Sequence, residues 1–425
     1  MSYPTGVESH GGKLRIWFMY RGSRIRESLG VDDTVKNRKI AGDLRSSVCY
    51  EIKTGTFNYS DRFPESPNLA RFGIARKEIT FHELCRKWLA LKEVEICKNT
   101  MQRYESTVSV LSEAVGPECM VSRMTVEYVL SLRKKLLTGT QILKPNHKSS
   151  PDGRSVSTVK GYMARLNGIL DFAESSGYIA MNPMKNVQQL RMSRVEPDPL
   201  TKEEFSRFLE ACKTRQDRNL WTIAVLTGMR HGELCALAWE DIDLVNRTIT
   251  VRRNYTQVGE FTLPKTESGT GRVIHLIDAA VEALRDQAEI SKMKSTHEIE
   301  VSLREYKRKD VHRCTFVFDP SYQIMNGRYG VSYSVAALGR KWNTALKKAG
   351  IRHRNAYQSR HTYACWLLTA GANPSFIASQ MGHANAQMLY QVYGKWMSEN
   401  NANQIELLNR QIGTFAPPMP QKRFA

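Results

Sequence analysis

The pattern of apolar and polar positions changes along the chain, and its first part predicts a small sheet followed by one helix. Residues 14–20 are apolar or aromatic apart from Arg15, and apolar and polar residues alternate over 24–29, so each stretch is expected to be a strand. Residues 21–23, Arg-Gly-Ser, lie between them and are typical of a hairpin turn. A helix is expected over 34–52, and the proline-containing polar stretch 60–77 is expected to be a linker.

The next part of the chain has apolar residues at helical spacing and predicts a helical domain. It opens with Thr80 and Glu83, a T-x-x-E pair that is typical of a helix N-terminus. Three further helices are expected, over 99–113, 125–137 and 157–177. Ser157 is expected to cap the last of them, and the polar stretch 144–153 is expected to be a loop.

A third part begins after residues 191–199, a polar stretch with two prolines that is the strongest candidate for a linker between domains. Thr201 and Glu204 form a second capping pair, and the part that follows is expected to be mostly helical. Two strands around a Gly/Ser-rich turn interrupt it, over 248–252 and 272–276. We interpret 291–312 as a polar, charged insertion and expect the proline-rich tail after 412 to be disordered.

Composition narrows the class of protein. The chain has 425 residues, which suggests about three domains, and 41% hydrophobic residues, which is enough for packed cores. No apolar run is long enough to span a membrane, and the polar N-terminus argues against a secretory signal. The eight cysteines show no metal-binding spacing and are expected to be free thiols in a reducing cytoplasm.

The charge of the chain indicates a polyanionic partner. Its 62 Lys and Arg exceed its 42 Asp and Glu, so the formal net charge is +20. Nucleic acid is the first candidate partner and an anionic membrane surface the second, and charge alone does not separate an enzyme from a binding module. Six basic residues are candidates for DNA contact, four around the predicted hairpin and two on the helix 157–177: Arg15, Arg21, Arg24, Arg26, Lys160 and Arg165. The alternative is that both groups are solvated faces.

One candidate site surrounds Arg230. An apolar helix is expected to end at Gly228, and a new helix starts at once with Arg230 and Glu233 in its first turn. Backbone N–H groups at a helix start favour anions, so an arginine here suits an anionic substrate. Glu233 is expected to hold the guanidinium group in place. The alternative is an ordinary turn with a surface arginine.

A second group of candidates lies near the C-terminal end. Arg360 and His361 precede an apolar stretch, 364–368, that is expected to be a helix. His383 follows in a Met-Gly-His segment, and Tyr390 and Tyr393 come after it, three residues apart. Taken singly, the histidine could be a cap or core residue and the tyrosines could be core residues.

Taken together and in this order, these segments resemble the tyrosine recombinase family, specifically the prophage-type integrases. The family's T-G-x-R-x-x-E-L segment is matched by 227–234, and Lys265 stands in the hairpin where the family has its lysine. Arg360 matches the arginine of the H-x-x-R motif, and His383 matches the L-G-H motif with Met for Leu. The matching motifs extend over about 200–396.

The resemblance implies a role for each matched residue. Arg230 and Arg360 would hold the non-bridging oxygens of a DNA phosphate, with His383 as a further donor. Guanidinium groups suit this task without a metal, because they are always charged and fork onto phosphate. A tyrosine would form a 3′-phosphotyrosyl link, and Lys265 would protonate the leaving 5′-oxygen. No metal, ATP or other cofactor is implied.

Two positions depart from the family pattern. Tyr357 stands where the family commonly has histidine, and we expect it to be a hydrogen-bonding replacement, since a tyrosine is a poor base at neutral pH. The nucleophile could be Tyr393, ten residues after His383, or Tyr390, seven after it. The family spacing and the surrounding Val-Tyr-Gly-Lys-Trp favour Tyr393.

The resemblance also implies a domain organisation that is multidomain and mainly α. The expected parts are a small β-sheet arm-type DNA-binding domain (1–60), a SAM-like helical core-binding domain (78–185), a mostly-α catalytic domain with a small β-hairpin or sheet (197–410) and a C-terminal tail (411–425). The implied activity is site-specific recombination that integrates or excises a prophage or mobile element. The protein would act as a homotetramer on double-stranded attachment sites, through a Holliday junction.

The resemblance further implies an excisionase and a host DNA-bending protein as partners, no membrane contact, and a place at the nucleoid in the bacterial cytoplasm. One alternative is a catalytically inactive recombinase-like DNA-binding protein, which only Tyr357 favours. A type IB topoisomerase shares the chemistry, but the arm-like domain favours an integrase. A metal-dependent nuclease fits poorly, because no carboxylate cluster stands out among the motifs.

Overall fold

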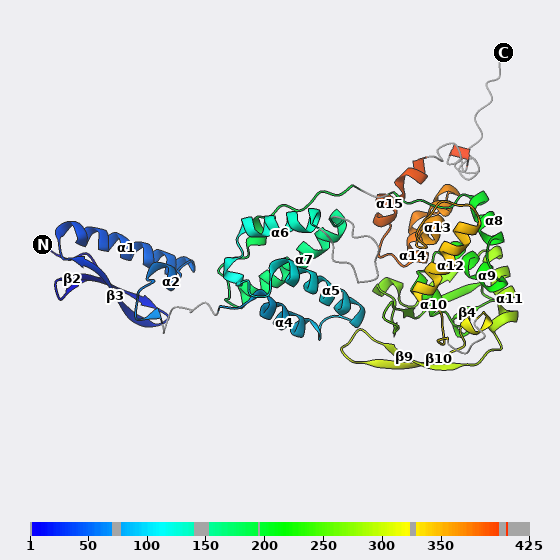
Figure 1. Ribbon diagram of the computed structural model, residues 1–425, viewed down its shortest axis with the longest axis horizontal. Coiled ribbons are helices and arrows are strands. Elements are labelled where there is room, and N and C mark those ends of the chain that lie inside the picture. Colours follow the sequence, from blue (N-terminus) through cyan, green and yellow to red (C-terminus); the bar gives the residue numbers. More distant parts are fainter. Residues whose placement is uncertain are drawn as a thin grey trace, which may run out of the picture. The chain divides into compact units, whose positions relative to one another are not determined.

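The computed structural model describes residues 2–69, 78–139, 153–193, 196–323, 329–398 and 405–406 (Figure 1). The chain divides into two compact units, Met1–Lys92 with Arg103–Met192, and Glu93–Gln102 with Ser193–Ala425. The tail expected over 411–425 lies outside the described residues, as does the loop expected over 144–153 apart from Gly153.

The first unit opens with an antiparallel sheet whose strands follow the chain order, β1(Val7–His10), β2(Lys13–Tyr20) and β3(Ser23–Asp32). Alternate residues of β2, Leu14, Ile16 and Phe18, are fully buried beneath helix α1(Val35–Thr54). The two expected strands and the helix are confirmed. Strand β1 was missed because it has four residues and only one of them is buried.

The expected linker 60–77 is wrong over its first residues, which belong to the packed core of the sheet. Helix α2(Tyr59–Arg62) lies there, and Tyr59 and Phe63 are buried against Phe18. A run of aromatic side chains therefore extends this small domain past residue 60. Residues 70–77 lie outside the described residues.

A helical bundle follows, and its core is made of leucine, valine and other apolar side chains. Its helices are α4(Phe81–Lys92), α5(Lys98–Val115), α6(Val126–Thr138) and α7(Val156–Ser175), with short 3₁₀ turns η1(Val121–Arg123) and η2(Pro183–Asn186). The expected cap Ser157 is wrong: Ser155 Oγ accepts from the backbone N–H of Thr158 at 3.2 Å, so α7 begins earlier. At the other end, Thr80 Oγ1 accepts from the N–H of Glu83 as predicted.

The second unit is mostly helical, with a core built around the aromatic rings of Phe208, Trp221 and Trp342, which pack edge to face. Its helices are α8(Lys202–Glu210), α9(Arg215–Thr227), α10(His231–Cys235), α11(Asp278–Ser291), α12(Val335–Lys348), α13(Gln358–Thr369), α14(Pro374–Met381) and α15(Gln387–Ser398). The 3₁₀ turns are η3(Trp239–Asp241), η4(Glu267–Gly269) and η5(Pro320–Tyr322). The capping pair of Thr201 and Glu204 is confirmed, with both reciprocal hydrogen bonds present.

Two small sheets lie in this unit. One has the order β4(Ile242–Asp243), β5(Thr248–Val251), β8(Arg272–His275), and includes both predicted strands. The other has the order β10(Lys309–Cys314), β9(His297–Ser302), β7(Phe261–Thr262), β6(Asn254–Tyr255), with β7 and β9 parallel.

The segment 291–312, interpreted as a charged insertion, is therefore mostly a β-hairpin. Ile299 and Val301 of β9 are buried, and the alternating Glu298 and Glu300 point to solvent. Buried apolar and exposed charged residues alternate along β9, as in a strand, but the sequence analysis considered only the charged residues.

Among the described residues, no helix is long and apolar enough to cross a membrane. No group of His, Cys, Asp and Glu in that part of the chain has the arrangement of a metal site. All eight cysteines are free, as expected.

Candidate active site

The candidate residues of the second unit meet where α9 ends, α10 begins, and α13 and α14 come together. Gly228 ends α9 with a positive φ of 61°, and a Cβ on it would lie 2.4 Å from the ring of Tyr363. Only glycine fits this left-handed, crowded turn. The turn places Arg230 at the start of α10 and directs the Gly228 carbonyl toward α13, where it accepts a hydrogen bond from Arg360.

Arg360 is buried at the centre of this group, with 1% of its surface exposed. Its guanidinium group donates to the carbonyls of Gly228 at 2.6 Å and Met381 at 2.7 Å, and contacts Nε2 of His383 at 2.8 Å. Burial, and then the neighbouring Arg230, lower the pKa of Arg360 to about 10, so it stays charged at neutral pH. One cation thus joins the ends of α9 and α14.

His383 has a defined tautomer because of this contact. Its Nε2 lies against a guanidinium, which can only donate, so the proton of the neutral ring is on Nδ1. Burial, and then the surrounding arginines, lower the pKa of His383 to about 4, which keeps the ring neutral. Nδ1 is buried and has no hydrogen-bond partner within the described residues, so the site holds an unused N–H donor.

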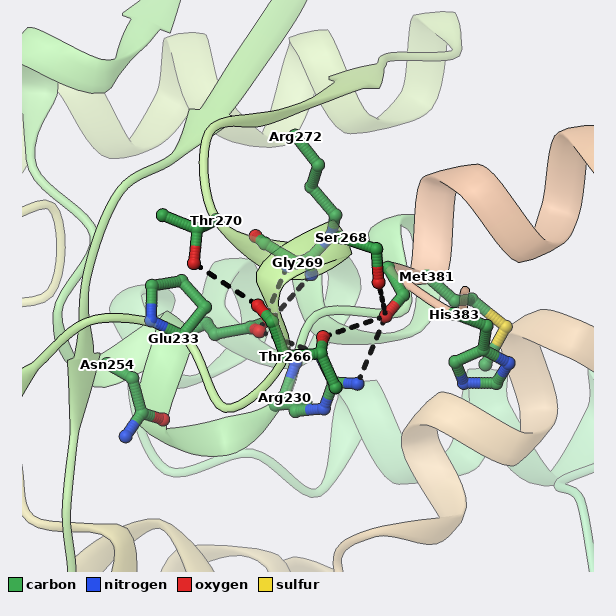
Figure 2. Close-up of polar contacts among 12 residues, drawn as sticks. Arg230, Glu233, Asn254, Thr266, Ser268, Gly269, Thr270, Arg272, Met381 and His383 are labelled. Atoms are coloured by element: carbon green, nitrogen blue, oxygen red, sulfur yellow. Dashed lines mark hydrogen bonds and ion pairs between the residues drawn. The ribbon is translucent and has the colours of Figure 1, made fainter. Parts of the chain in front are cut away.

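A second cluster lies beside the first and is built on Glu233 (Figure 2). This carboxylate is fully buried and binds Arg230 Nη1 at 2.9 Å and Arg272 Nη2 at 2.6 Å. It also accepts from the backbone N–H of Arg230 at 2.9 Å, which closes the first turn of α10. Burial alone would raise the pKa of Glu233, but the adjacent Arg272 and Arg230 outweigh it and lower the pKa.

Arg272 is a site residue that the sequence analysis assigned only to a strand. It is buried in β8 and also donates to the carbonyls of Gln380 and Gly269. Alternation along β8 places it on the same buried face as Ile274. An arginine at an inward strand position was the available signal, since a buried charge requires a partner.

The carbonyl of Gly382 links the loop after Lys265 to these clusters. Thr266 Oγ1 donates to it at 3.1 Å, Ser268 Oγ at 3.4 Å and Arg230 Nη2 at 3.5 Å (Figure 2). Lys265 itself is exposed and, among the described residues, has no hydrogen-bond or ion-pair partner. The structure therefore places its backbone beside the site and leaves its side chain unengaged.

The two candidate nucleophiles have opposite environments. Tyr393 is buried, with 3% of its surface exposed, and its hydroxyl lies 2.6 Å from Nδ1 of His361. Tyr390 is 54% exposed. Burial raises the pKa of Tyr393, so this phenol is protonated at rest.

His361 is the second residue of the site to which the sequence analysis gave no role, although it named this histidine beside Arg360. The expectation that Arg360 and His361 precede their helix is wrong, because α13 begins at Gln358 and contains both. Tyr357 lies one turn before His361, and the centroids of the two rings are 5.2 Å apart. Tyr357 is 43% exposed, and its hydroxyl has no hydrogen-bond partner in the described part of the chain.

The DNA-contact candidates lie in the first unit, away from these groups in sequence. On the sheet, Arg15 and Arg26 pair with Glu8, Arg24 covers the Trp17 ring, and Arg21 lies over the Tyr20 ring. On α7, Lys160 is exposed and Arg165 lies over the Tyr104 ring. Two of the four sheet arginines therefore already have a carboxylate partner.

Glu233→Gln is expected to lower the free energy of unfolding by about 3–5 kcal/mol at pH 7, because it leaves the buried Arg272 and the partly exposed Arg230 without their counter-charge. The pKa of Glu233 is lowered in the folded state, so its contribution is present above the unfolded value of about 4.3 and is lost as pH falls. Urea unfolding of the whole chain at several pH values measures this difference. It should shrink between about pH 5 and pH 3.

The matched control is Glu298→Gln, at a largely exposed position of β9, which is expected to change stability by less than about 0.5 kcal/mol. A Glu233→Gln variant as stable as this control would show that the arginines find other partners.

The arrangement suits an anionic group with a nearby nucleophile. Two guanidinium groups bind the single carboxylate of Glu233, and the third, that of Arg360, is bound to backbone carbonyls and His383, so positive charge is left over. Arg230 is partly exposed and His383 offers a free N–H, and both are donors suited to phosphate oxygens. The buried phenol of Tyr393 on α15 is hydrogen-bonded to His361, which follows the central Arg360 on α13.

Comparisons with known proteins find family models and relatives that match the chain. The sequence model of the Arm DNA-binding domain matches residues 4–67, and that of the Phage integrase family matches residues 199–399. Two relatives from Escherichia coli (strain K12) match nearly end to end. "Putative defective protein IntQ" is 51% identical, covering 92% of this chain and 98% of its own, and "Prophage integrase IntR" is 45% identical, covering 96% and 99%.

A solved structure shares the fold. It is a lambda integrase tetramer bound to a Holliday junction, with a TM-score of 0.54 and 17% identity over 91% of this chain and 97% of that one.

Proposed function

This chain belongs to the phage integrase family and is a site-specific DNA recombinase, and we propose that it cuts DNA by joining Tyr393 to a 3′-phosphate. The observation that carries this proposal is the position of the Tyr393 hydroxyl. It is bound to the residue that follows Arg360, so a buried phenol is fixed beside the buried cation of the site.

We assign the phosphate contacts to Arg230, Arg360 and His383. The Nη2 of Arg230 has only a long contact to a carbonyl, so it can turn to a phosphate oxygen. The three contacts of Arg360 leave further N–H donors on the same group, and Nδ1–H of His383 is unused. Arg272 is bound on all sides by Glu233, Gln380 and Gly269 and supports the others.

The leaving 5′-oxygen needs a proton, and we assign this role to Lys265. Its neighbour Thr266 and Arg230 both donate to the Gly382 carbonyl, so the lysine lies next to the residues assigned to the phosphate. Tyr357 remains a candidate for a hydrogen bond to the substrate, since the residue is partly exposed.

We propose that the protein assembles as a homotetramer on paired double-stranded attachment sites. The similarity to the tetramer on a Holliday junction and the net charge of +20 support this assembly. The arm domain would bind separate DNA sites through the sheet that carries Arg21 and Arg24. As for a prophage integrase, we also propose that an excisionase and a host DNA-bending protein are its partners. Its place of action would be the bacterial nucleoid.

The test uses a nicked, labelled DNA duplex that carries the candidate attachment core. The whole chain is incubated with it in EDTA, and denaturing gels show any covalent adduct. We expect an adduct, and digestion followed by mass spectrometry should place the DNA on the peptide that contains Tyr393.

Two outcomes would contradict the proposal. Adduct formation that requires a divalent metal would exclude arginine-based, metal-free transfer. A protein that binds the duplex and forms no adduct would be an inactive DNA-binding relative, the alternative that Tyr357 favours.

A further inference from the structure

The Tyr393 hydroxyl has one partner that could take its proton. Nδ1 of His361 lies 2.6 Å from it, which is the distance of a strong hydrogen bond, and the two residues belong to different helices, α15 and α13. In the described part of the chain, no other side chain is hydrogen-bonded to this oxygen. A nucleophilic oxygen in contact with a single imidazole is the arrangement of an activated hydroxyl.

We propose that His361 is a catalytic residue of this recombinase, the base that accepts the proton of Tyr393 as its oxygen attacks the DNA phosphorus. The proposal rests on the function assigned above. Tyr357 occupies the position where an imidazole was expected, and His361 lies one turn later on the same side of α13, against the tyrosine ring. The chain therefore supplies its imidazole from the next turn and aims it at the nucleophile.

The electrostatic state of the pair fits this direction of transfer. Burial, and then Arg360, lower the pKa of His361 to about 4, so the ring is neutral and can accept. Burial raises the pKa of Tyr393, so the proton begins on the phenol. The titratable groups around the pair are Tyr357 just before α13, Arg360 and Cys365 on α13, and His383 after α14.

Bound DNA would strengthen the base. A phosphate beside Arg360 offsets the positive charge that lowers the pKa of His361. The phenol also becomes more acidic as its oxygen bonds to phosphorus, so a weak base is sufficient in the transition state.

The step balances without any further reagent. The O–H bond of Tyr393 breaks, and its proton goes to Nδ1 of His361. The phenolic oxygen bonds to phosphorus, the bond from phosphorus to the 5′-oxygen breaks, and that oxygen takes a proton from Lys265. In rejoining, the 5′-hydroxyl attacks phosphorus and gives its proton back to Lys265. The bond from phosphorus to the phenolic oxygen breaks, and that oxygen takes back the proton held by His361.

A purely structural role for the same contact is the competing explanation, because the bond also holds α15 against α13. The two differ in how the rate depends on pH. If His361 only anchors α15, its replacement should lower the stability of the protein, or the fraction of molecules in which Tyr393 is in position, by the same factor at every pH. If His361 is the base, a variant without it can react only through the small fraction of Tyr393 that is already a phenolate. The rate of adduct formation by that variant should then rise tenfold per pH unit.

The test is His361→Asn, whose amide can still accept a hydrogen bond near the position of Nδ1 but cannot take a proton. Single-turnover adduct formation on the nicked duplex is followed between about pH 6 and pH 9. At pH 7 the variant should be slowed about 100-fold and should show the tenfold rise per pH unit, while wild type is nearly flat. Gel-shift affinity and the circular dichroism spectrum should match wild type.

The control is His353→Asn, at an exposed loop position, which should keep the wild-type rate and profile. A His361→Asn rate within threefold of wild type, or a slow rate with the wild-type pH profile, would overturn the proposal and leave an anchoring role. If His361→Asn does not fold, His361→Gln is measured in its place against the same criteria. Absence of adduct from wild type itself would instead overturn the function proposed above.

Discussion

Tyr393→Phe is expected to abolish covalent adduct formation, with a loss of at least about 10⁴-fold, because no phenolic oxygen remains to attack phosphorus. The variant keeps the ring that packs near Trp396 and loses only the hydrogen bond to His361. Its stability should therefore fall by only about 1 kcal/mol. Denaturing gels with the nicked duplex measure the adduct, and gel shifts confirm that DNA binding is kept.

Tyr390→Phe is the matched control, one turn earlier on α15 and exposed to solvent. We expect its adduct yield to stay within about twofold to threefold of wild type, as for a surface substitution. An adduct that survives Tyr393→Phe and disappears in Tyr390→Phe would exchange the two roles. That result would require α15 to turn when DNA binds, because Tyr390 is exposed in this structure and it is Tyr393 that is bound to His361.

Local chemistry of the chain was sufficient to predict most of the elements around the site. The Thr201 and Glu204 pair predicts the start of α8, and Gly228 predicts the end of α9, because each satisfies backbone groups within a few residues. The fold class and the family followed from these elements together with the order of the motifs.

The start of α13 could not be predicted in this way, because its support comes from distant residues. Gln358 accepts from the backbone N–H of Asp198, and Thr362 accepts from that of Leu200. The polar residues of the first turns are buried by these contacts, so the segment lacks the one-sided apolar pattern of an exposed helix. The sequence analysis therefore placed Arg360 and His361 before a helix that in fact contains them.

The missed site residues have the same explanation. Arg272 is paired with Glu233, 39 positions away, and His361 with Tyr393, 32 positions away. Periodicity and motif spacing report contacts within an element, and neither indicates which side chains meet between elements. A charged residue on the inward face of a strand, and a histidine beside a motif arginine, are the signals to examine.

Arg360→Lys is the second substitution with a very large expected effect. Lysine keeps the charge but has a single ammonium group, which cannot serve the carbonyls of Gly228 and Met381 and the ring of His383 together. We expect adduct formation to slow by at least about 10³-fold, since both a phosphate donor and the support of His383 are lost. The free energy of unfolding should also fall by about 1–3 kcal/mol for each buried carbonyl left unpaired.

The matched control is Arg340→Lys, at an exposed position of α12, where charge and length change in the same way without buried contacts. Single-turnover rates and urea unfolding of both variants separate the two losses, since the rates are measured where each protein is fully folded. If Arg360→Lys reacted within tenfold of wild type, the fork geometry would be dispensable. Arg230 and His383 would then have to hold the phosphate, and the buried cation would act mainly by joining α9 to α14.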